Sequence, residues 1–116
     1  MNKNLLLLVF FFIGNLNFIN IKALNINEEM SAARRAFIQN NFDKAISHLD
    51  LIISNKPTFF DAFSLKGKCK LELDQYNEAL DNFQMAHNLK PQESEYLYYK
   101  GLCEWRLKRQ STAIQS

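Results

Sequence analysis

The sequence is poor in glycine, proline and cysteine, and each shortage excludes a class of protein. Its 116 residues include three glycines and two prolines, too few for a collagen-like, loop-rich or low-complexity chain. The two cysteines are too few for a scaffold stapled by several disulfides. What remains is a chain long enough for one small domain with its own core.

The sequence also lacks an excess of charge over most of its length. Lys3 and Lys22 lie in the first 23 residues, which contain no acidic residue, so residues 24–116 carry 12 basic and 12 acidic side chains. A neutral domain has no broad positive surface for DNA or RNA. We therefore expect no nucleic-acid partner.

The first 23 residues have the three parts of a secretory signal peptide. Lys3 provides a basic start, residues 5–13 read LLLLVFFFI, and the stretch that follows is mixed and polar. Cleavage is expected after Ala23, and the expected location is the secretory pathway, meaning secreted, periplasmic or ER lumen. The alternative is a membrane anchor over residues 5–21 that is not cleaved, although a spanning helix needs about 20 predominantly apolar residues.

A period of 34 residues runs through the rest of the chain. This offset relates the only two prolines, Pro57 and Pro91, and the only two glycines after the leader, Gly67 and Gly101. The other matches are Phe42 with Tyr76, Leu49 with Phe83, Phe63 with Leu97, Cys69 with Cys103, Leu73 with Leu107, and Ala45 with Ala79 and Ala113. So many matches at one offset are not expected by chance.

Each unit of this period is predicted to be a pair of helices, because its apolar residues recur at spacings of three and four. The expected helices span about 26–39, 43–55, 59–73, 77–89 and 93–108, with a short stub after 111. Three residues at equivalent positions are predicted to cap helices: Asp43, Asn77 and Ser111. Thr58 to Asp61 has the form of a capping box, and Pro57 and Pro91 prevent the preceding helices from continuing.

These features resemble the tetratricopeptide repeat (TPR) family, whose unit is a helix–turn–helix of 34 residues. The second unit matches the family pattern best, at Phe63, Gly67, Tyr76, Ala79, Phe83, Ala86 and Pro91. The first unit has Ala33 where glycine is usual, and the third has Gln110 where an aromatic is usual. The resemblance implies an all-α solenoid over residues 24–116, with repeats at about 26–59 and 60–93 and a truncated third repeat at about 94–116.

The small residues and the cysteines have predicted structural roles. Gly67 and Gly101 are expected where facing helices approach most closely. Cys69 and Cys103 hold equivalent positions on neighbouring units, where helix axes lie about 8–10 Å apart. A disulfide requires Cα atoms within roughly 7 Å. We therefore expect two separate buried thiols, with a redox pair as the alternative.

No arrangement of residues with catalytic chemistry stands out. His48 and His87 occupy different repeat positions and lack a His or Cys partner four residues away, whereas a metal site needs three or four converging ligands. They are read as surface or boundary residues of helices. The sequence contains neither a nucleophile elbow nor a glycine-rich phosphate loop. It therefore predicts no enzyme activity, no metal and no cofactor.

In the TPR family the first helix of each unit lines a concave groove that binds peptides. Carried over by position, the groove residues are Met30, Arg34, Phe37, Ser64, Lys68, Leu71, Glu72, Tyr98, Leu102, Trp105 and Arg106. One subclass of the family clamps the terminal carboxylate of cytosolic Hsp70 or Hsp90. At the corresponding positions stand Met30, Arg34, Leu65, Glu95 and Tyr99, of which only Arg34 could contact a carboxylate, so that clamp is absent.

The resemblance implies an exported scaffold that binds a protein or peptide through this groove without catalysis. One alternative is the N-terminal repeat region of a larger secretory-pathway protein, such as an ER-lumen co-chaperone. Another is a membrane-anchored assembly factor that keeps its leader. Only residues 111–116 represent the second helix of the third unit, so we expect a fragment or the start of a longer array. Tyr99, Leu102 or Trp105 would then pack against a further helix rather than a ligand.

Overall fold

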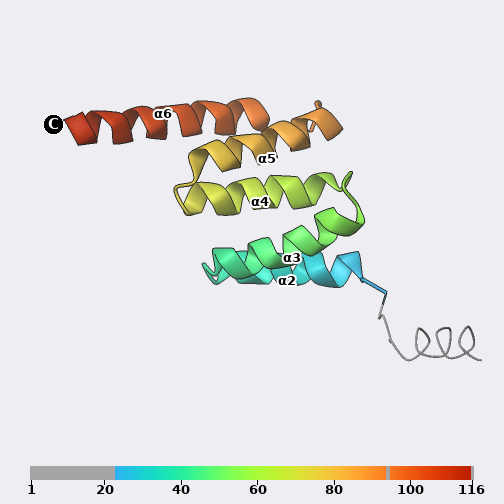
Figure 1. Cartoon of the computed structure of the whole chain (residues 1–116). Coiled ribbons are helices and arrows are strands. Elements are labelled where there is room, and N and C mark those ends of the chain that lie inside the picture. The colour runs from blue at the N-terminus through green and yellow to red at the C-terminus, as the bar shows by residue number, and fades with distance from the viewer. Residues whose placement is uncertain (1–22, 94, 116) are drawn as a thin grey trace, which may run out of the picture.

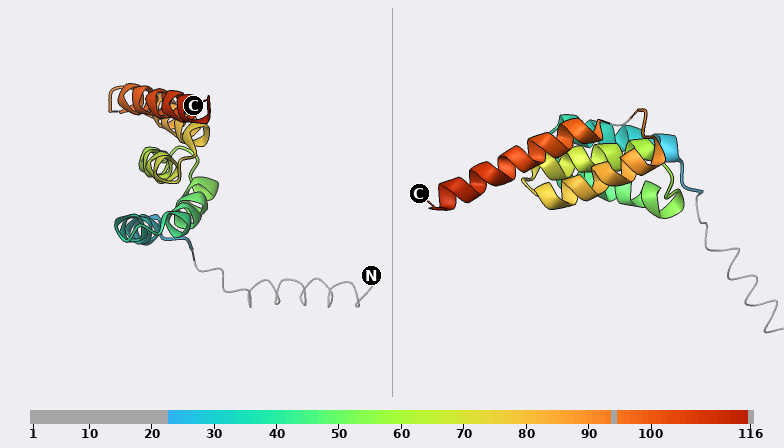
Figure 2. Two further views of the ribbon diagram at one scale, coloured as in Figure 1. Left: turned by 90° about the vertical axis from the view of Figure 1, so that its left-hand side faces the viewer. Right: turned by 90° about the horizontal axis from the view of Figure 1, so that it is seen from above.

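The computed structural model describes residues 23–93 and 95–115, and within these residues the chain is entirely α-helical (Figure 1). The helices are α2 (Ile26–Ile38), α3 (Phe42–Asn55), α4 (Phe60–Glu72), α5 (Tyr76–Leu89) and α6 (Tyr96–Gln115). Each packs against the next along the chain, and α2 also contacts α4. Viewed end-on, α2 and α4 lie on one side of the array, with α3 and α5 on the other (Figure 2). The predicted all-α class is confirmed, whereas residues 1–22 of the predicted leader, which spans residues 1–23, lie outside the described residues.

The turns from α2 to α3 and from α4 to α5 have the same backbone geometry. Asn40 and Asp74 adopt left-handed conformations, with φ of 59° and 61°, which short polar side chains tolerate better than most. The next amide in each turn donates back to the last helical turn, from Asn41 N to Ala36 O at 2.8 Å and from Gln75 N to Lys70 O at 2.9 Å. Both helices therefore end in a Schellman motif that satisfies their last carbonyls and reverses the chain.

The predicted caps of α3 and α5 lie two residues too far along the chain. Asn41, not Asp43, caps α3, because its side-chain oxygen accepts from Lys44 N at 3.3 Å. Gln75 precedes α5 without a side-chain cap bond, so Asn77 lies inside the first turn. The capping box at Thr58 does not form either, since the cap position of α4 is Phe59. The start of each helix follows from the turn before it.

The predicted break after residue 108 is also wrong, because α6 continues without interruption to Gln115. Lys108 stands at the position where Asn40 and Asp74 adopt the left-handed conformation. Gln110 stands where Phe42 and Tyr76 pack into the core. With neither turn residue nor aromatic anchor, the local preference for helix prevails, and Ser111 lies in mid-helix rather than at a cap. The C-terminal part of α6 therefore projects past the other helices (Figure 2).

Two hydrophobic clusters hold the array together. The first joins α2, α3 and α4 through Met30, Ala33, Ala36, Ala45, Leu49, Ile52, Ala62 and Cys69. The second joins α4, α5 and α6 through Leu71, Tyr76, Ala79, Phe83 and Cys103. Within the second cluster the ring of Phe83 stacks on that of Tyr99, with centroids 4.2 Å apart and planes 6° from parallel.

The two glycines in the helices have different surroundings. A Cβ added at Gly67 would lie 2.6 Å from Cε1 of Phe83, so the close approach predicted there is confirmed. At Gly101 the prediction is wrong, since nothing lies within 4 Å of an added Cβ. The difference arises because α5 covers α4 at Gly67, whereas no described residue covers α6 at Gly101.

Candidate binding surface

A pocket of about 140 Å³ lies between α2 and α4. We call it the α2–α4 pocket, and it is lined by Met30, Arg34, Asp61, Ser64, Leu65 and Lys68. The four residues from α4 recur at spacings of three and four, so they share one face of that helix. Met30 is almost fully buried, Leu65 is half-buried, and Arg34 and Asp61 are exposed at the rim. The accessible lining of the pocket is therefore mostly polar and charged.

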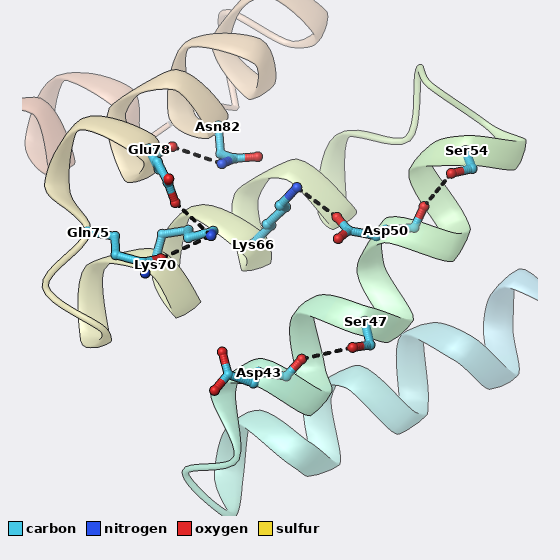
Figure 3. Close-up of polar contacts among 9 residues, drawn as sticks. All are labelled: Asp43, Ser47, Asp50, Ser54, Lys66, Lys70, Gln75, Glu78 and Asn82. Atoms are coloured by element: carbon cyan, nitrogen blue, oxygen red, sulfur yellow. Dashed lines mark hydrogen bonds and ion pairs between the residues drawn. The ribbon is translucent and has the colours of Figure 1, made fainter.

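The three lysines of α4 are held to different extents, and only one faces the α2–α4 pocket. Figure 3 shows the other two turned toward neighbouring helices, with Lys66 Nζ 2.7 Å from Asp50 Oδ1 and Lys70 Nζ 2.6 Å from Glu78 Oε2. Lys70 also donates to Gln75 Oε1 at 2.9 Å. These pairs bridge α4 to α3 and to α5, so Lys66 and Lys70 serve the packing of the array.

Lys68 and Arg34 are less engaged. Lys68 Nζ lies 3.6 Å from an exposed Glu95 carboxylate and 5.7 Å from the ring centroid of Tyr99. Within residues 23–93 and 95–115, Arg34 has no ion-pair partner. A pair as exposed as Lys68–Glu95 contributes little to stability, so a ligand carboxylate could replace it at small cost. The rim of the α2–α4 pocket thus offers two cations to a negatively charged group.

The predicted groove residues on α2 and α4 divide into surface residues and core residues. Met30, Arg34, Ser64 and Lys68 come together in the α2–α4 pocket. Leu71 is buried in the second cluster and is not available to a ligand. Phe37 is half-buried and packs edge-on against Phe42, with ring centroids 5.5 Å apart. Glu72 is exposed.

The predicted groove residues of α6 lie outside the α2–α4 pocket. Leu102 and Arg106 are half-buried, and Leu102 packs against the second cluster. Tyr98 and Trp105 are exposed, at 68% and 52% of their full surface. The Arg109 guanidinium lies 4.8 Å from the ring centroid of Trp105, in a cation–π contact. These side chains therefore form a second surface, separate from the first.

Two residues of the α2–α4 pocket were absent from the predicted groove. Asp61 had been assigned to a capping box and Leu65 only to the clamp comparison. Their positions three residues before Ser64 and three before Lys68 place them on the same helical face, which is the signal that could have found them. Tyr99 was considered in the clamp comparison and as part of a missing interface, but its ring stacks on Phe83, and burial raises its pKa to about 12.

Both histidines are half-buried on the sides of their helices, in agreement with the prediction of surface or boundary residues. Nδ1 of His48 is 2.6 Å from Oε2 of Glu29, a half-buried contact that links α3 to α2. The ring of His87 stacks on Tyr96, with centroids 5.0 Å apart. In the described part of the chain no three His, Cys, Asp or Glu side chains converge as metal ligands would.

The two cysteines are free and buried, in agreement with the sequence prediction. Burial raises the pKa of the Cys69 thiol to about 11 and also raises that of Cys103. Because the thiolate is the reactive form, both thiols are chemically protected in the folded protein.

Thiol labelling measures this protection. With an aromatic disulfide reagent near pH 8, we expect Cys69 in the native protein to react on the order of a hundredfold more slowly than in the urea-unfolded protein, since each unit of pKa lowers the thiolate fraction tenfold, and we expect Cys103 to be slowed as well. Met85→Cys supplies an exposed control thiol on α5, which should react at once. Rapid labelling of two thiols in the unsubstituted native protein would show that Cys69 and Cys103 are accessible.

Comparison with known proteins gives no relative to guide the assignment. No protein-family model matches the chain, and no curated protein sequence matches it. Within residues 23–93 and 95–115, no helix combines the length and apolar character that a membrane span requires. The proposal below therefore rests on the chain's own residues and on the family resemblance.

Proposed function

We propose that the chain is an exported TPR-type scaffold whose α2–α4 pocket binds an acidic segment of a partner protein, without catalysis. The 34-residue sequence period and the matching turns at Asn40 and Asp74 support the repeat assignment. The charged leader with its apolar block supports export. The observation that carries the binding proposal is the pocket itself, whose lining includes the two cations Arg34 and Lys68.

The pocket favours a partner with an acidic side chain. Arg34 lacks an intramolecular ion pair with any described residue, and the contact of Lys68 with Glu95 is long and exposed. Asp61 at the rim disfavours a second acidic residue on its side. The combination selects one carboxylate rather than a polyanion.

Charge reversal tests the proposal. The double variant Arg34→Glu with Lys68→Glu should lower the association rate constant of fluorescently labelled acidic peptides by about tenfold or more at low salt, because opposite charges steer the encounter. The loss should shrink as salt is added, since exposed charges are screened. Stopped-flow fluorescence anisotropy measures the rates, and circular dichroism checks that helical content is unchanged.

A matched control separates the pocket from net charge. Arg35→Glu with Lys44→Glu makes the same change in net charge at two exposed positions outside the pocket. This control should keep most of the association rate of the unsubstituted protein. Equal losses in both double variants would contradict a site at the α2–α4 pocket, and no preference for acidic over neutral peptides would contradict the proposed partner chemistry.

A further inference from the structure

The face of α6 opposite α5 carries an uncovered apolar stripe. We call it the outward α6 face and define it by Leu97, Tyr98, Gly101 and Trp105, with Lys108 at its C-terminal edge. Spacings of three and four place these residues on one side of the helix. Leu97, Tyr98 and Trp105 are 76%, 68% and 52% exposed, and nothing lies within 4 Å of an added Cβ at Gly101. In Figure 1 no other helix lies beyond α6 on this side.

The same pattern on α4 is covered by a helix. Phe63, Gly67 and Leu71 hold the positions on α4 that Leu97, Gly101 and Trp105 hold on α6, and all three residues of α4 are buried. The ring of Phe83 from α5 lies directly over Gly67. On α4, therefore, a stripe of large apolar residues around a glycine is the surface on which another helix, α5, packs. The outward α6 face has the composition to receive another.

Charge along α6 identifies a suitable occupant. The C-terminal half of the helix carries Lys108 and Arg109, both exposed, and its N-terminal approach carries Glu93 and Glu95. Glu93 lies 3.5 Å from Lys90, and Glu95 lies 3.6 Å from Lys68 and also forms a side-chain hydrogen bond with Tyr99. A second α6 in antiparallel orientation would bring its acidic end beside this basic end, whereas a parallel one would bring like charges together.

We propose that a second copy of the chain docks on the outward α6 face, with the two α6 helices antiparallel about a two-fold axis at Gly101. Residues equally far before and after Gly101 then face each other, so Trp105 lies on Leu97 of the second copy. Arg109 then lies toward the turn that carries Glu93, just before α6, in the second copy. The two glycines at the crossing allow the helices to approach closely, and such an isologous contact closes as a dimer.

The dimer leaves the α2–α4 pocket open, so this proposal stands apart from the proposed peptide binding. A single helix pair lies at or below the lower end of stable interface sizes, so we expect a reversible dimer with a roughly micromolar dissociation constant. Sedimentation velocity over a range of concentrations measures it. All variants keep the full chain, so any association through residues 1–22 is common to all of them.

Substitution at Gly101 gives the first test. Gly101→Gln should raise the dissociation constant by about tenfold or more, because a long side chain at the crossing separates the helices. In the monomer the new side chain meets only open space, so the melting temperature should not fall. A dimer of unchanged affinity in Gly101→Gln, or a monomer at every concentration without substitution, would overturn the proposal.

Charge exchange tests the orientation. Arg109→Glu alone should weaken the dimer, because it places two acidic residues near each other at each of the two symmetric contacts. The double variant Arg109→Glu with Glu93→Arg should restore the dimer, because opposite charges then meet again at both contacts. A double variant as weak as the single one would rule out the antiparallel register.

Cross-linking tests the axis. Under mild oxidation Gly101→Cys should form a disulfide-linked dimer, because Cα atoms at a close helix crossing come within the roughly 7 Å that a disulfide needs. Gln110→Cys is the matched control, an exposed position on another face of the same helix. Cys69 and Cys103 are buried and should not contribute. Equal yields from the two variants would contradict an axis at Gly101.

Discussion

Replacing Phe83 by alanine should lower the free energy of unfolding by about 3–5 kcal/mol, the largest loss expected from any single truncation in the second cluster. Phe83 is 2% exposed, covers Gly67 on α4 and stacks on Tyr99 of α6. Its removal therefore leaves a cavity shared by three helices. Neighbouring side chains cannot fill it, because the glycine opposite has none. Urea denaturation followed by circular dichroism measures the loss.

A control on the same helix separates this packing from helix propensity. Met85 is 42% exposed, and Met85→Ala should change the free energy of unfolding by less than about 1 kcal/mol. Amide exchange adds a spatial readout, since Phe83→Ala should speed exchange in α6 more than in α2. Similar stability losses for both variants, or faster exchange in α2 than in α6, would contradict the role given to Phe83.

The sequence predicts the first four helices well because strong signals mark their ends. Pro57 and Pro91 marked the ends of α3 and α5 in the sequence. The ends of α2 and α4 were placed by the period, and the structure shows that the left-handed residues Asn40 and Asp74 form the turns there. The fifth helix was predicted to end near 108 by extending the period. The period predicts a turn only where the residues that form the turn recur. Lys108 and Gln110 replace the left-handed residue and the aromatic residue of the earlier turns. Local helix preference then decides, and α6 runs on to Gln115.

The candidate site was predicted by helix position, and its errors have a common cause. Spacing places Lys68 and Leu71 on adjoining faces of α4, but it does not say where α5 will cover the helix. The structure buries Leu71 and leaves Lys68 at the rim of the α2–α4 pocket. The same reason explains Gly101, which looks equivalent to Gly67 in the sequence. Whether a residue is buried depends on which neighbouring helix covers it. The repeat pattern of a single helix does not carry that information.

The two helix glycines should respond to alanine with opposite signs. Gly67→Ala should lower the free energy of unfolding by about 1–3 kcal/mol, because its Cβ would lie 2.6 Å from the ring of Phe83 and the helices must move apart. Gly101→Ala should raise it by up to about 1 kcal/mol, because alanine favours helix over glycine and its Cβ meets open space. Urea denaturation at protein concentrations low enough to keep the chain monomeric compares the two.

A double-mutant cycle assigns the cost at Gly67 to Phe83. In the background of Phe83→Leu, a smaller and more flexible side chain stands over Gly67, so Gly67→Ala should cost less than it does beside phenylalanine. No comparable coupling is expected between Gly101 and Phe83, because the ring lies over α4 at Gly67 and nothing lies near Gly101. If Gly67→Ala costs the same in both backgrounds, the penalty comes from the backbone of α4 itself. If Gly101→Ala destabilises the monomer as Gly67→Ala does, α6 is covered at Gly101 by a contact within the chain, and the outward α6 face is not free to receive a second copy.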